Sequence, residues 1–137
     1  MAKEIINLTG HPITIIGNSE YNPLIRKSII PKGKEPKIIK VIPSYEMAFG
    51  KYKTIGIKSD DDIPRVVKEV AGCDGLPAVD DIENTDFVVS VSYAKAYFKM
   101  HPKYKLRNFY TVGDLVYDSS GKNVVGCRAL SLFNEYL

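Results

Sequence analysis

The sequence predicts an α/β domain of the α+β kind: a mostly antiparallel or mixed β-sheet, one principal helix at about residues 92–100, and a C-terminal β-hairpin. Three observations predict it. Short β-branched runs recur along the chain, a single segment has apolar residues at helical spacing, and Tyr110–Leu132 contains two apolar runs around a turn. With 137 residues, of which 45% are hydrophobic and 26% charged, residues 1–137 have the size and composition of a single domain.

The first half of the chain predicts short strands separated by turns. β-Branched residues concentrate in four runs, which are Glu4–Leu8, Pro12–Ile16, Lys37–Ile42 and Lys53–Lys58. Residues 17–18, 21–23 and 31–36 contain Gly, Asn and Pro and predict turns or loops between these runs. We expect Lys53–Lys58 to be one arm of a ribbon that turns near Phe49-Gly50.

An acidic cluster, Asp60–Asp62, precedes a segment of ambiguous type. The cluster lacks the spaced oxygen ligands and the distal glutamate of a calcium loop, which favours a solvated turn. In Ile63–Val70, an acidic N-cap and the position of Pro64 fit a helix, whereas three valines fit a strand equally well.

The second half of the chain predicts a unit of strand, helix and hairpin. Phe87–Val91 is the most hydrophobic short run and is typical of a central strand that is buried on both faces. The apolar residues of Ser92–Met100 then recur at helical spacing, with Ser92 as a suitable N-cap and His101-Pro102 as a stop signal. Tyr110–Leu132 closes the unit as a hairpin around the turn Asp118–Gly121.

Composition and motifs argue against several classes of function. The net charge of +3 permits an anionic ligand but gives no strong signal for duplex nucleic acid. No apolar run approaches the ~20 residues that cross a membrane, and no secretion signal is visible, so we expect a cytoplasmic protein, in the host cytoplasm if it is viral. The two cysteines and two histidines lack metal spacing, and no known catalytic or phosphate-binding motif occurs, so we expect no metal, no cofactor and no enzyme activity.

Several stretches of the chain share a pattern with other proteins. They are Asn7–Ile13 (NLTGHPI), Gly75–Pro77 (GLP), Phe87–Ser90 (FVVS) and Gly121–Leu130, which ends in GCRAL. Together they resemble a family of small, uncharacterised phage, prophage and bacterial proteins, which typically have an NLTPH-like start, a GLP turn before a strand and helix, and a hairpin ending in GCRAL. The resemblance covers nearly the whole chain except the extra segment Met47–Lys58. It implies a strand at Ile63–Val70 and a viral or mobile-element origin, and it carries no established activity.

His11 is a candidate for a polar ligand contact at the N-terminal motif. It lies between a predicted strand end and Pro12, and it follows Asn7 and Thr9 closely in the sequence. Its imidazole suits either a ligand-facing role near neutral pH or a turn in which it bonds backbone groups.

Arg128 is the corresponding candidate in the C-terminal hairpin. It should lie on the opposite face of its strand from Cys127, which fits a small buried residue. The guanidinium suits either bidentate binding of a carboxylate or phosphate, or a structural ion pair to Asp114 or Asp118.

Basic residues alternate with tyrosines through residues 92–110. Positive charge beside aromatic faces is what contacts to phosphates and bases require. The same mixture is normal for an amphipathic helix that packs on a sheet. Tyr93, Lys95 and Tyr97 are therefore candidate ligand-binding residues, together with Asn7, His11 and Arg128.

These observations predict a function and leave one alternative. We expect a non-enzymatic, phage-type binding protein that counteracts host defence by sequestering a small anionic, nucleotide-derived signalling ligand. In that mechanism Arg128 and nearby lysines hold phosphates, Tyr93 or Tyr97 stacks on a base, and His11 with Asn7 reads polar edges. The alternative is a protein–protein inhibitor or structural module that acts on a host protein. A homo-oligomer fits either, because paired pockets across a two-fold axis are common in small binders.

Overall fold

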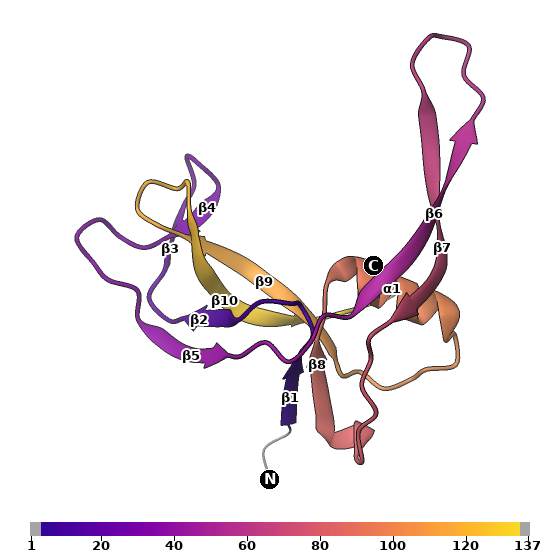
Figure 1. The fold of residues 1–137 in the computed structure, drawn as a ribbon. Helices are drawn as coiled ribbons and strands as arrows, with labels where there is room; N and C mark the ends of the chain where they lie inside the picture. The colour runs from indigo at the N-terminus through magenta and orange to yellow at the C-terminus, as the bar shows by residue number, and fades with distance from the viewer. Residues whose placement is uncertain (1–3, 135–137) are drawn as a thin grey trace.

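Eight strands form one mixed sheet, and two further strands form a separate ribbon that projects from it (Figure 1). The structure is a computed structural model that describes residues 4–134. Its elements are β1 (Glu4–Asn7), β2 (Ile13–Ile16), β3 (Glu20–Asn22), β4 (Lys27–Ile29), β5 (Ile38–Ile42), β6 (Phe49–Ile57), β7 (Arg65–Asp74), the 3-10 turn η1 (Ile82–Asn84), β8 (Thr85–Val88), α1 (Val91–Met100), β9 (Phe109–Tyr117) and β10 (Val124–Leu132). The predicted α+β class, with one principal helix and a C-terminal hairpin, is confirmed.

The sheet combines parallel and antiparallel pairs in the order β1-β8-β9-β10-β2-β5. β8 is parallel to both of its neighbours, β1 and β9. β9 and β10 form the predicted antiparallel hairpin, β10 is parallel to β2, and β2 is antiparallel to β5. A strand that is covered on both faces needs a continuous apolar run. β8 meets this requirement, because Phe87, Val88 and the following Val89 are all buried.

The main core lies between the sheet and α1. Phe87 from β8 and Phe109 from β9 pack edge to face with ring centroids 5.6 Å apart. Tyr93 and Tyr97 of α1 lie against Phe109 at centroid distances of 6.2 and 4.8 Å. The same apolar spacing that predicted the helix therefore supplies its buried face.

The N-cap of the helix lies two residues earlier than predicted. Its N-cap is Ser90, not Ser92, and the Ser90 hydroxyl accepts a hydrogen bond of 3.1 Å from the Tyr93 N–H. Val91, predicted to end the preceding strand, is therefore the first residue of the helix. The helix ends before His101, as the following Pro102 predicts.

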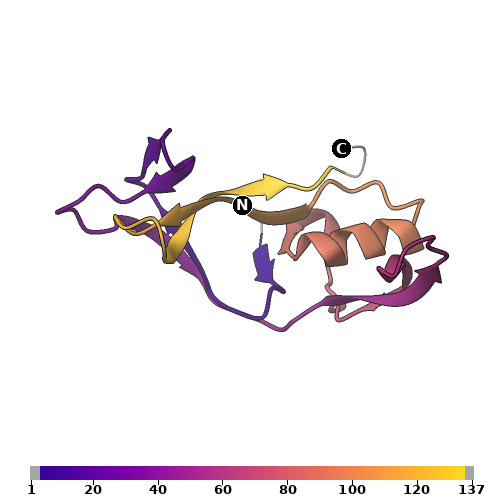
Figure 2. The ribbon, with the colours of Figure 1, turned by 90° about the horizontal axis from the view of Figure 1, so that it is seen from above.

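The ribbon, residues 49–74, is formed by β6 and β7. The prediction that it turns near Phe49-Gly50 is wrong, because β6 begins at Phe49 and the turn lies at residues 58–64. Part of the ambiguous segment Ile63–Val70 is a strand, since β7 starts at Arg65. Figure 2 shows α1 between the sheet and the base of the ribbon, so the helix has partners on two sides.

Two further strands, β3 and β4, are absent from the sequence-based prediction. They form a hairpin with three residues in each strand, and β4 joins the sheet by parallel pairing with Val116 and Tyr117 of β9. Each strand is too short to have a pattern of its own, so the conformation of β4 depends on its pairing with β9 and that of β3 on its pairing with β4.

Candidate functional site

Asn7 holds the N-terminal turn together. Its side chain is 1% exposed, and its Nδ2 donates to the carbonyl oxygens of His11 and Ile42 at 2.8 and 3.2 Å. Its Oδ1 accepts from the N–H and the hydroxyl of Thr9 at 3.0 and 2.6 Å. The amide is thus used within the chain, which corrects the prediction that Asn7 reads the polar edge of a ligand.

Tyr93 and Tyr97 belong to the core. Tyr93 is 0% and Tyr97 8% exposed, and burial raises the pKa of both phenols. Tyr93 is completely enclosed, and Tyr97 lines a recess of about 420 Å³ at the end of α1 together with Lys103 and Tyr104. At 8% exposure the Tyr97 ring presents no open face on which a nucleobase could stack. The prediction that either ring stacks on a base is therefore wrong, and the alternative interpretation of an amphipathic helix packed on a sheet holds.

His11 is exposed at the rim of a shallow hollow of about 210 Å³. The hollow lies between β2 and the β9–β10 hairpin, and its lining includes Val112, Leu115 and Cys127 but no Lys or Arg. His11 Nδ1 lies 3.2 Å from the Pro12 carbonyl oxygen. Ligand pockets are commonly ~300–1,000 Å³, and this small apolar hollow offers a phosphate no cation.

Lys95 and Arg128 are both exposed, one on α1 and the other on β10. Within residues 4–134, neither makes an ion pair with a carboxylate. The suggested pairing of Arg128 with Asp114 or Asp118 is therefore not formed, and Asp118 instead accepts hydrogen bonds from Ser120 and Asn123. Arg128 is not part of the lining of the hollow at His11, so the structure does not gather the predicted residues into one pocket.

A second hollow, of about 620 Å³, has the wrong charge for an anion. It lies beside β1 and η1, and its lining includes Glu4, Asp80 and Asp81 together with Tyr45. No Lys, Arg or His contributes to it. Its carboxylates would repel a phosphate group at neutral pH.

The two cysteines are free thiols. Burial raises the pKa of Cys127, which is 1% exposed. Burial also raises the pKa of Cys73, and the negative charge of the nearby Asp74 carboxylate adds a smaller upward effect. Both thiols are thus shifted away from the reactive thiolate form. In the part of the chain that the structure covers, no group of three His, Cys, Asp or Glu residues is placed to hold a metal ion, and no helix is long and apolar enough to span a membrane.

The ribbon presents exposed apolar side chains that the sequence analysis did not single out. Because side chains alternate along a strand and paired residues share a face, Ile55 and Val67 lie opposite each other on one face. Ile57 extends the same face toward the tip, and these three side chains are 38–51% exposed. Val66, 55% exposed, lies on the other face. We call residues 53–69 the ribbon arm.

Charged residues flank the apolar pair on its face. Lys53 lies opposite Glu69 in an ion pair of 3.8 Å, on the side toward the base. Arg65 lies opposite Ile57, on the side toward the tip. The apolar pair of Ile55 and Val67 therefore lies between the ion pair of Lys53 and Glu69 and a cross-strand pair that contains one charged residue, Arg65.

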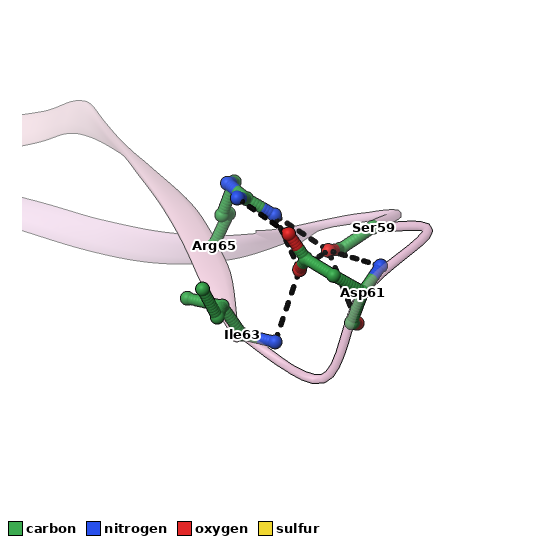
Figure 3. A network of polar contacts seen from close by, with 4 residues as sticks. All are labelled: Ser59, Asp61, Ile63 and Arg65. Atoms are coloured by element: carbon green, nitrogen blue, oxygen red, sulfur yellow. Dashed lines mark hydrogen bonds and ion pairs between the residues drawn. The ribbon is translucent and has the colours of Figure 1, made fainter.

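A polar network closes the tip of the arm (Figure 3). Arg65 donates to both carboxylate oxygens of Asp61, at 2.7 and 2.9 Å, and to the Ser59 hydroxyl at 2.6 Å. The Ile63 N–H donates to Asp61 at 3.0 Å. Hydrogen bonds from the Arg65 guanidinium and, to a smaller extent, from the Ser59 hydroxyl hold the pKa of Asp61 well below its usual value. The acidic cluster is thus a turn, as predicted.

Among residues 4–134, it is the base of the ribbon that packs on the rest of the protein. There the Tyr52 hydroxyl donates to the Ser92 carbonyl oxygen at 2.5 Å, and Gly50 lies against Ala96. Farther out, a Cβ built on Gly56 would meet no atom within 4 Å. Both edges of the ribbon are free of strand partners in the described chain. A two-stranded hairpin by itself is marginally stable in water, so the arm has surface that a partner would stabilise.

The accessible surface of the whole chain agrees with this extended shape. A compact monomer of this mass exposes about 7,100 Å², whereas this chain exposes 9652 Å². The difference is roughly a third of the compact value. The ribbon arm is the most plainly projecting part of the molecule (Figure 1).

Comparison of the chain with protein-family models, with curated proteins and with solved structures yields no match.

Proposed function

We propose that this protein is a non-enzymatic protein-binding module and that the ribbon arm is its contact surface. The observation that carries the proposal is the pair of Ile55 and Val67, half-exposed on a two-stranded arm with both edges unpaired. Exposed apolar patches bordered by charge mark protein contacts in soluble proteins. Free strand edges add backbone hydrogen-bond groups that a partner strand satisfies.

The alternative of small-ligand capture has less support. Its stacking residues, Tyr93 and Tyr97, are buried in the core, and Asn7 is engaged with Thr9 and His11. The remaining cations, Lys95 and Arg128, are exposed and line neither of the two hollows. The recess of about 420 Å³ at the end of α1 does combine Lys103 with the rings of Tyr97 and Tyr104, but none of Asn7, His11, Lys95 and Arg128 lines it.

A binding role also fits the chemistry of the described residues better than catalysis does. Cys127 is buried and its pKa is raised, so it is a poor nucleophile. His11 is exposed at the rim of an apolar hollow and lies beside its own neighbour's carbonyl oxygen. The resemblance to phage and prophage proteins would place a host defence protein among the partners of such a module, and it is equally compatible with a structural role.

Capture from a lysate with matched variants tests the proposal. The double substitution Ile55→Ser and Val67→Ser removes the apolar pair from the arm without touching the core. The matched control, Ile38→Ser and Val41→Ser, removes the same residue types from β5, where they are similarly exposed. We expect the wild type and the β5 control to retain the same partner protein and the arm variant to lose it. Equal retention by all three proteins would refute the arm as the contact surface.

A further inference from the structure

We infer that the ribbon arm pairs with the arm of a second copy of this chain, edge to edge through β7. This inference rests on the proposed function, because it names the partner of the same surface. The β7 edge is available along residues 65–70, where its pairing with β6 is regular on the other side. Antiparallel pairing of two such edges would convert two marginal hairpins into one four-stranded sheet, and three or more strands are what a sheet needs to be stable by itself.

The charges of β7 fit an antiparallel copy of the same strand. When Val67 is set opposite Val67 of the second copy, Arg65 falls opposite Glu69 of that copy, and the two-fold symmetry repeats this pair. All three residues lie on one face of the ribbon, because they are separated by two positions each. Opposite charges placed directly across two strands stabilise the pairing.

This register also joins the apolar pairs of the two arms. Ile55 and Val67 of one copy would continue into Val67 and Ile55 of the other, as one apolar row across four strands. On each side of it a charged row would run through Lys53 and Glu69 to Arg65 of the second copy. Pro64 precedes β7 and has no N–H, so the pairing ends naturally after five residues per strand.

Neighbouring registers and the other edge fit less well. A shift by one residue in one direction sets Arg65 opposite Lys68 of the second copy, which places like charges together. A shift in the other direction sets Arg65 and Glu69 opposite valines. The β6 edge contains Lys51 and Lys53 and no acidic residue, so two β6 edges would repel each other. Charge complementarity therefore selects β7.

The chain as a whole exposes more surface than a compact monomer of its mass, and the projecting arm contributes to that excess. A stable interface typically buries about 800 Å² on each partner. The chain exposes 9652 Å², about 2,500 Å² more than a compact monomer of its mass. Burial of part of the arm's surface against a second copy lies within that excess.

Disulfide trapping of the full-length chain tests the geometry directly. In this register the two Val67 residues face each other with a Cα separation of about 5 Å, within the reach of a disulfide. The two Val66 residues are diagonal neighbours at about 7–8 Å, beyond that reach. We expect Val67→Cys to give a covalent dimer on mild oxidation, and the matched control Val66→Cys and the wild type, which keeps Cys73 and Cys127, to give none.

Charge reversal provides an independent test by sedimentation velocity over a range of concentrations. Glu69→Arg turns two attractive pairs into two repulsive ones and should weaken the wild-type dimer roughly 30-fold. Arg65→Glu has the same effect on the pairs between the copies, and it also removes the contact of Arg65 with Asp61 at the tip. An equimolar mixture of the two variants restores opposite charges across the two-fold axis, so association should return. Lys68→Glu, a reversal on the other face of the ribbon, is the control and should leave association closer to the wild type.

The outcomes separate this inference from the proposed function. A wild type that is monomeric at every concentration, or equal trapping at positions 66 and 67, would overturn the β7 pairing. A dimer that neither Glu69→Arg nor Arg65→Glu weakens would overturn it as well. The lysate capture with the Ile55→Ser and Val67→Ser variant then decides separately whether the arm binds a different protein.

Discussion

Replacement of Asn7 by alanine should destabilise the protein strongly, because the side chain ties the turn that contains Thr9 and His11 to Ile42 of β5. It takes part in hydrogen bonds with Thr9, His11 and Ile42, four in total. A net contribution of about 1 kcal/mol for each bond would give about 4 kcal/mol. Water can replace some partners, since only the bond to Ile42 is fully buried. We therefore expect a loss of about 3 kcal/mol in the free energy of unfolding.

Thermal unfolding followed by circular dichroism measures this loss. A change of about 3 kcal/mol in a chain of this size lowers Tm by about 10 °C. The matched control is Asn18→Ala, since the Asn18 amide donates to the Glu35 carbonyl oxygen and accepts from the Lys37 N–H, but in exposed bonds. That control should lose no more than about 1 kcal/mol. If Asn7→Ala melts no lower than Asn18→Ala, the structural role assigned to Asn7 is refuted.

Three further predictions concern packing, pH and thiol chemistry. Gly126→Ala should lower Tm markedly, because its Cβ would lie 2.5 Å from a backbone carbonyl oxygen of β2, whereas Gly56→Ala, in open space, should be close to neutral. Hydrogen bonds from Ser120 and Asn123 lower the pKa of Asp118 to about 2. The stabilisation of the hairpin turn by these hydrogen bonds should therefore be complete above about pH 4 and lost as the pH falls through about 2. NMR shifts of the Asp118 carboxyl group would report this titration. A carboxyl that titrates near pH 4 would contradict this. In the native protein a thiol reagent should modify Cys73 before the fully buried Cys127, and both at once only after unfolding; the reverse order of labelling would contradict the fold.

The elements that could be predicted from the sequence are those whose pattern is local. The hairpin of β9 and β10 has two β-branched runs and a turn whose Asp118 side chain bonds the intervening residues, so a short window contains all the information. The helix is similar, since its apolar residues recur at one spacing and Pro102 ends it. The choice between Ser90 and Ser92 as N-cap depends on a single hydrogen bond, which two nearby serines make equally plausible in sequence.

The predictions that failed concern elements whose conformation depends on partners far away in the sequence. β4 has three residues, and what keeps it extended is its pairing with Val116 and Tyr117. The sequence predicts the ribbon turn near Phe49-Gly50, and a glycine at that point is compatible with a turn. In the structure that glycine serves close packing against Ala96 instead. Local propensity does not distinguish these two uses of glycine.

The candidate site shows the same limit. Tyr93 and Tyr97 have one spacing in the sequence, and that spacing fits a core face and a ligand face equally. Only the position of Phe109, far along the chain, decides that they are buried. The surface at Ile55 and Val67 has a signal in the sequence, namely two apolar strands with no third strand nearby to cover them. Recognition of that signal requires the strand order, which the sequence does not provide.

The packing at Gly50 fixes the direction in which the arm points. A Cβ at this position would lie 2.8 Å from the Tyr52 ring and 3.0 Å from the Ala96 methyl group, so a side chain there would push the ribbon away from the helix. Because the arm is long and is held at its base, a small rotation at the base produces a large displacement at the tip. A change as small as one methyl group at Gly50 would therefore leave both the body and the arm folded while redirecting everything the arm carries.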